Sequence, residues 1–151
     1  MKSKLINIIM LGVILSGCAA AKVSDVISDK ARGKGDRRVF AVSSEQAWKI
    51  SNHILRDWML SGAIEEHKEA GYLLAGAGGA GSGLDSAQVF IGVWIEPMDK
   101  NSTRIIAVSR GRVTNSLSSY EFCVRFDQAV AIIKSGGLLP KTMPPWPSTP
   151  E

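Results

Sequence analysis

The chain has 151 residues, of which 45% are hydrophobic and 21% charged, which fits one small globular domain with short extensions. The hydrophobic fraction excludes a disordered chain, and two cysteines are too few for a disulfide-stapled miniprotein. The 18 basic and 14 acidic residues give a net charge of +4, but residues 38–135 carry ten of each. A neutral domain argues against nucleic acid as a partner.

The N-terminus has the pattern of a secretory signal. Lys2 and Lys4 precede a nearly unbroken apolar run over residues 5–15. As a helix this run is roughly 16 Å long, about half of the hydrocarbon core of a bilayer, so it is too short to span a membrane. With the small residues that follow, it predicts a signal peptide over residues 1–17.

The run ends in Leu15-Ser16-Gly17-Cys18, which resembles the lipobox of bacterial lipoproteins. The resemblance implies cleavage between Gly17 and Cys18 and lipidation of Cys18, palmitate included. Because Ala19 rather than Asp follows the cysteine, it also implies sorting to the outer membrane, facing the periplasm. Two or three acyl chains make a stable anchor, whereas one is marginal. The alternative is an ordinary signal peptide or a buried N-terminal helix with a chance cysteine.

Residues 18–37 are polar, contain Gly33 and Gly35 and lack a long apolar period, which predicts a flexible linker. Five basic and three acidic residues give this stretch a charge of +2. Either the stretch is attracted to anionic head groups, at roughly 1 kcal/mol per basic residue near the surface, or it is a solvated tether.

The domain is predicted over residues 38–137. Period-2 patterns and turn residues predict strands over residues 38–42, 63–67, 72–75, 88–96 and 104–113. Two capping-box patterns, at residues 43–46 and 118–121, each precede apolar residues spaced three or four apart, which predicts two amphipathic helices. The order β-α-β-β-β-β-α predicts an α+β fold, a two-layer sandwich with an antiparallel sheet and both helices on one face.

The C-terminal residues 138–151 form a proline-rich tail. Five prolines surround Trp146, so the tail is predicted to be polyproline II or disordered. A tryptophan held between Pro144, Pro145 and Pro147 loses little entropy on docking, which makes this segment a candidate partner-binding site.

A lipoprotein domain that runs strand, helix, several strands and closing helix resembles the helix-grip modules of BamC-type envelope lipoproteins. The resemblance covers about residues 38–135 and is carried by the strand leading into residues 43–46, the turn at 65–71, the strand end at 91–97 and the closing helix. Those proteins have two modules and a long unstructured lead, whereas this chain has one module and a short lead. The resemblance supplies no catalytic residues.

Other motifs favour structural interpretations. Residues 76–81 match GxGxxG, but a strand rather than a helix follows, so residues 76–83 are predicted to be a mobile glycine-rich loop and not a dinucleotide site. His67 lies among three glutamates without a zinc-type spacing, which predicts a solvated acidic turn. Cys123 lies between apolar residues and is predicted to be buried. Neither a metal nor a cofactor is therefore predicted.

The sequence thus predicts a non-enzymatic cell-envelope lipoprotein, an accessory or scaffolding subunit that binds another envelope component. The alternative is a module that binds a small ligand or cell-wall glycan between sheet and helices. A small envelope hydrolase is a third hypothesis, but no GxSxG motif or Cys-His pairing supports it.

Overall fold

The computed structural model describes residues 21–79, 83–111 and 117–147, so the predicted signal peptide and Cys18 lie outside the described residues. Five strands form one antiparallel sheet in the order β1-β5-β4-β3-β2. The strands are β1 (Asp36–Phe40), β2 (Ala63–His67), β3 (Tyr72–Ala77), β4 (Val89–Pro97) and β5 (Thr103–Gly111). The helices are α1 (Val23–Ala31), α2 (Ser44–His53), its π-helical continuation η1 (Ile54–Trp58), the 3-10 turn η2 (Leu84–Ser86) and α3 (Ser119–Lys134).

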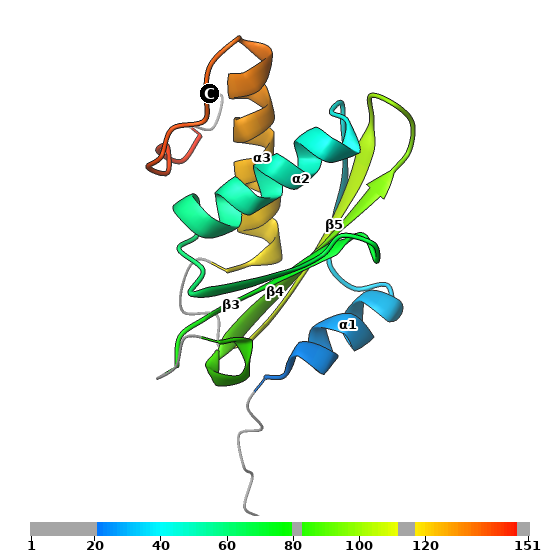
Figure 1. Cartoon of the computed structure of the whole chain (residues 1–151), viewed down its shortest axis with the longest axis vertical. Coiled ribbons are helices and arrows are strands. Elements are labelled where there is room, and N and C mark those ends of the chain that lie inside the picture. The colour runs from blue at the N-terminus through cyan, green and yellow to red at the C-terminus, as the bar shows by residue number, and fades with distance from the viewer. Residues whose placement is uncertain (1–20, 80–82, 112–116, 148–151) are drawn as a thin grey trace, which may run out of the picture.

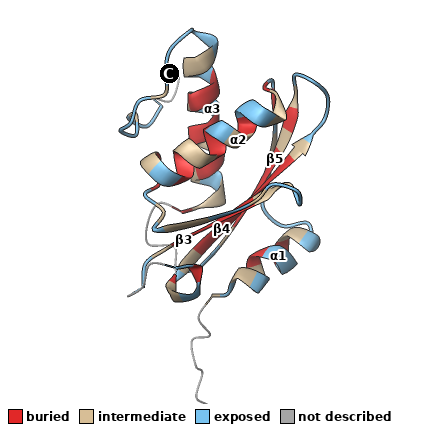
Figure 2. Cartoon of the chain, in the orientation of Figure 1, coloured by how far each residue is buried: buried red, intermediate tan, exposed pale blue. Residues whose placement is uncertain are grey.

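The predicted α+β sandwich is confirmed. Helices α2 and α3 cover one face of the sheet, and their buried side chains meet those of all the strands except β2 in the main core (Figures 1 and 2). Phe126 of α3 packs against Phe40 with 4.4 Å between ring centroids and the rings tilted by 44°, which ties the last helix to the first strand. Period-2 alternation is the reason why the strands could be predicted, because alternate residues face this core.

Both predicted helix starts are observed. The Ser43 hydroxyl accepts a hydrogen bond from the Gln46 amide, and the Gln46 side chain accepts one from the Ser43 amide, so this capping box is complete. At α3 the Ser118 hydroxyl accepts from the amide of Glu121. The Glu121 carboxylate, however, forms an ion pair with Arg125 one turn later, at 3.7 Å.

The prediction of a flexible linker over residues 18–37 is wrong for most of its length. Residues Val23–Ala31 form α1, which packs on the opposite face of the sheet, and β1 already begins at Asp36 (Figure 1). Val26 is fully buried in a second core with Phe90, Trp94 and others. A single buried apolar position leaves no long periodicity, so tertiary packing rather than helix propensity determines α1.

A glycine in β4 makes this packing possible. A Cβ atom at Gly92 would lie 2.6 Å from the Trp94 ring and 2.8 Å from Val26. Any side chain at this position would therefore push either the indole or α1 away from the sheet.

Candidate functional site

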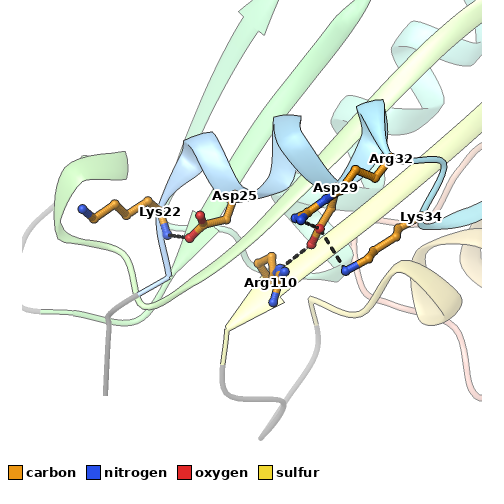
Figure 3. A network of polar contacts seen from close by, with 6 residues as sticks. All are labelled: Lys22, Asp25, Asp29, Arg32, Lys34 and Arg110. Atoms are coloured by element: carbon orange, nitrogen blue, oxygen red, sulfur yellow. Dashed lines mark hydrogen bonds and ion pairs between the residues drawn. The ribbon is translucent and has the colours of Figure 1, made fainter. Parts of the chain in front are cut away.

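A buried carboxylate fixes α1 to the sheet (Figure 3). One Asp29 oxygen lies 2.6 Å from the Arg32 guanidinium and 3.1 Å from the Lys34 ammonium, and the other accepts a hydrogen bond from Arg110 of β5. The Arg110 hydrogen bond, supported by Lys34 and Arg32, holds the pKa of Asp29 well below its ordinary value despite burial. The role of Asp29 is therefore to tie two elements together.

This network predicts acid-sensitive stability. Because the folded state lowers the pKa of Asp29, its contribution is complete above the unfolded pKa of about 3.9 and is lost as the pH falls through the folded pKa. An Asp29→Asn variant should be less stable at neutral pH and should lose less stability than the wild type between roughly pH 4 and pH 2. Urea unfolding at a series of pH values measures how steeply the free energy of unfolding of each protein falls with pH. Equal slopes would contradict the assigned role.

The proline-rich tail is docked on its own domain, so the predicted alternative of a disordered tail is wrong for residues 138–147. At its start, the Pro140 carbonyl accepts a hydrogen bond from the Trp58 indole at 2.8 Å and lies 2.9 Å from Nε2 of His53. Trp58 is almost fully buried, so the Pro140 carbonyl satisfies a donor that the core would otherwise leave unpaired.

Further along, the tail covers a cation of α3. Arg125 is 4% exposed and its guanidinium donates to the Pro144 carbonyl at 2.9 Å, while Gln128 donates to the Pro145 carbonyl at 2.8 Å. The Trp146 ring lies over the Arg125 guanidinium at 4.3 Å, although half of its surface stays exposed. Three predicted site residues, Trp146, Pro144 and Pro145, thus contact this chain itself, and Pro147 is exposed beside them.

Removal of the tail is expected to destabilise the domain moderately. A chain ending at Gly137 loses the carbonyl acceptors of Trp58, Arg125 and Gln128. At roughly 0.5–1.5 kcal/mol each, offset by the entropy of the freed tail, the free energy of unfolding should fall by about 1–3 kcal/mol. Urea titration followed by circular dichroism measures the change. An unchanged midpoint would show that the docked tail contributes nothing to stability.

A candidate binding site, the Trp48 groove, lies beside α2 at the end of the sheet where β4 finishes. It has a volume of about 610 Å³ and runs between α2, the turn that joins β2 to β3, and the end of β4. Trp48, Ile95 and Pro97 supply apolar surface, and four charged side chains line much of the remainder: Glu45, Lys49, Lys68 and Glu69. This volume is within the range of pockets that hold ligands, about 300–1,000 Å³.

A polar contact fixes the tryptophan of this groove. The Trp48 indole donates to the Glu66 carboxylate at 2.8 Å, and this hydrogen bond is the main cause of the lowered pKa of Glu66. The Lys68 ammonium lies 3.6 Å from Glu66 and 5.9 Å from the Trp48 ring centre. Sequence reasoning missed the groove because its two walls are far apart in the chain.

The remaining predicted motifs have local roles. Gly76 and Ala77 belong to β3, and residues 80–82 lie outside the described residues. Gly78 and Gly79 have positive φ angles, and the one-turn η2 precedes β4 in place of an α-helix. His67 lies 3.6 Å from Glu65 at the β2–β3 turn. Cys123 is fully buried, and its burial raises the pKa of its thiol to about 12.

The carboxyl groups whose pKa values are lowered do not resemble a catalytic pair of acid and base. Each carboxyl with a lowered pKa is held by a donor of its own, Lys49 for Glu45 and Ser102 for Asp99. Within the described ranges, His, Cys, Asp and Glu side chains form no group of three or more that could hold a metal ion. Among these same residues, no helix is both long and apolar enough to cross a membrane.

Comparison of the chain with models of known protein families, with curated proteins and with solved structures finds no match. Any function must therefore be argued from the residues and their geometry.

Proposed function

We propose that this protein is a lipid-anchored, non-enzymatic module of the cell envelope that binds a segment of another envelope protein in the Trp48 groove. The observation that carries the proposal is the chemistry of the groove. Apolar surface from Trp48 and Ile95 can receive a side chain of the partner, and the rim offers charges of both signs. Aromatic anchors within a polar rim are typical of protein interfaces.

The mixed rim favours a protein segment over a neutral sugar. Glu45 and Lys49 form an ion pair at 2.7 Å on α2, while Lys68 and Glu69 belong to the opposite wall. A partner that carries both a cation and a carboxylate beside an apolar residue complements these charges. Glu66 occupies the indole N–H of Trp48, so this donor is not available to a sugar hydroxyl.

The position of the groove fits a module tethered at its N-terminus. The chain enters at α1, at the lower end of the molecule in Figure 1, whereas α2 begins and β4 finishes towards its upper end. A lipid on Cys18 would thus leave the groove directed away from the anchor.

Site-specific photo-crosslinking in cells tests the proposal. A photoreactive amino acid replaces Lys49 or Lys68 in the groove and, as matched controls, Lys100 or Lys134 elsewhere on the exposed surface. Both groove positions should give the same discrete product with an envelope protein, and the control positions should not. Products of equal yield at all four positions would contradict the proposal.

A rim variant separates binding from folding. Glu69→Lys reverses one charge of the groove without altering the core, and should reduce the crosslink while the unfolding midpoint stays unchanged. Isolated cell wall provides the other arm of the test. If the protein sediments with peptidoglycan and Glu69→Lys abolishes this, the groove binds glycan and the proposed protein partner is wrong.

A further inference from the structure

Cations gather where α1 ends and the chain turns into β1. Arg32, Lys34 and Arg110 surround Asp29, and their side chains are 58%, 57% and 42% exposed. The Arg37 guanidinium reaches back to the same turn, 3.5 Å from the position that a Cβ of Gly33 would occupy. We call these four cations the α1 basic cluster.

The α1 basic cluster keeps an excess of positive charge. Asp29 is 4% exposed, so its carboxylate is covered by the cations rather than presented to solvent. Asp25, one turn earlier on α1, is the other carboxylate close enough to act on Arg110. Four cations and two carboxylates leave a net charge of +2, and the side chains of Arg32, Lys34 and Arg110 are each partly exposed to solvent.

The outward face of α1 is suited to lie on a flat surface. Its exposed positions follow helical spacing and carry small or apolar side chains, namely Ser24, Ile27, Ser28 and Ala31. Ile27 is 42% exposed although it is a large apolar residue. An apolar residue on a face flanked by cations is typical of helices that lie at a membrane interface.

Covalent geometry brings this face close to the predicted anchor. Between Cys18 and Val23 there are five Cα–Cα steps, which span at most about 18 Å. Val26 and Asp29 hold α1 firmly on the sheet, so the domain cannot move far from a lipid on Cys18.

From these observations, and resting on the proposed lipid anchor, we infer that the outward face of α1 lies on the membrane and that the α1 basic cluster binds anionic phospholipid head groups. The partner is thus a lipid surface of negative charge. Each basic residue near such a surface changes membrane affinity by roughly fivefold, so removal of three should weaken this contact by about a hundredfold.

A single label on each of two surfaces tests the orientation. Of the native cysteines, Cys123 is fully buried and Cys18 carries the lipid under the proposed function, so a fluorophore attaches to a new cysteine alone. Ser28→Cys places it on the outward face of α1, and Asn101→Cys places it on the exposed turn between β4 and β5 as the control. The full-length lipidated protein is reconstituted in vesicles of phosphatidylcholine, with or without phosphatidylglycerol, and quenched with aqueous acrylamide.

The Ser28→Cys label should be quenched several times less than the Asn101→Cys label in vesicles that contain phosphatidylglycerol. Adding Arg32→Gln, Lys34→Gln and Arg37→Gln should remove this protection, while Arg110 still pairs with Asp29. Arg56→Gln, Lys134→Gln and Lys141→Gln remove the same charge at exposed positions outside the α1 basic cluster and the Trp48 groove, and should leave the protection intact. The inference would be overturned if acrylamide quenched both labels equally on anchored protein. It would also be overturned if the Ser28→Cys label were equally protected in vesicles without phosphatidylglycerol, or if both triple variants changed the protection to the same extent. Protein that does not stay on vesicles would instead refute the anchor.

Discussion

A Cys18→Ser variant is expected to lose its stable attachment to the membrane while the domain remains folded. The serine hydroxyl cannot take the place of the thiol that lipidation requires, and residues 5–15 are too short to hold the chain across a bilayer. Because two or three acyl chains convert marginal binding into stable anchoring, the change should be nearly complete. Cell fractionation followed by mass spectrometry measures it, since the wild type should carry the mass of a lipid on its first residue.

The second cysteine provides the matched control. Cys123 lies in the core, and Cys123→Ala removes its sulfur without adding a polar group, so this variant should keep the full membrane fraction. If Cys18→Ser protein still sediments with membranes as an intact, folded chain, lipid on Cys18 is not the main attachment.

A Val26→Asp variant is expected to release α1 from the sheet without unfolding the rest of the domain. Val26 has no exposed surface, and an unpaired carboxylate at its position would cost several kcal/mol to desolvate. A helix of nine residues cannot supply that free energy by its own propensity, so α1 should detach and lose its helical structure. The main core on the other face of the sheet does not contain Val26 and should persist.

Limited trypsin digestion measures the release, because Lys30, Arg32 and Lys34 are cleavage sites in or next to α1. Cleavage after Lys30 should become at least tenfold faster in Val26→Asp, in proportion to the open population of α1. The matched control is Ile27→Asp, which adds the same charge to the neighbouring, exposed position and should digest like the wild type. Equal rates for the two variants would show that α1 is not held by the burial of Val26.

Local patterns were sufficient for most of the fold. Residues 63–67 were predicted as a strand and form β2 with the same bounds. The start of α2 at the Ser43–Gln46 capping box could be predicted because the hydrogen bonds of the box join residues only three apart. The placement of both helices on one side of an antiparallel sheet followed from the need to bury one apolar face of each element, whereas the order of the strands in the sheet comes from the structure.

The candidate site could not be predicted in the same way. Trp48 contacts Glu66, eighteen positions later, and the end of β4 completes the groove. The tail was predicted from its prolines to be polyproline II or disordered and to bind a partner, yet it docks on its own domain through carbonyls that accept hydrogen bonds from Trp58 and Arg125. Prolines restrict the backbone but keep their carbonyl acceptors, so composition cannot reveal where those acceptors find donors.

The sequence by itself determined the elements whose signal is local, namely the five strands and the two capped helices, and the lipobox at Cys18 stays a prediction. Only the tertiary structure decided the state of residues 23–31, because α1 owes its stability to one buried valine and to the ion pairs of Asp29. Arg110, which pairs with Asp29, lies 81 positions after it in the chain. Such long-range contacts stabilise a segment whose own sequence would not be helical in water, and a short stretch of sequence cannot reveal them.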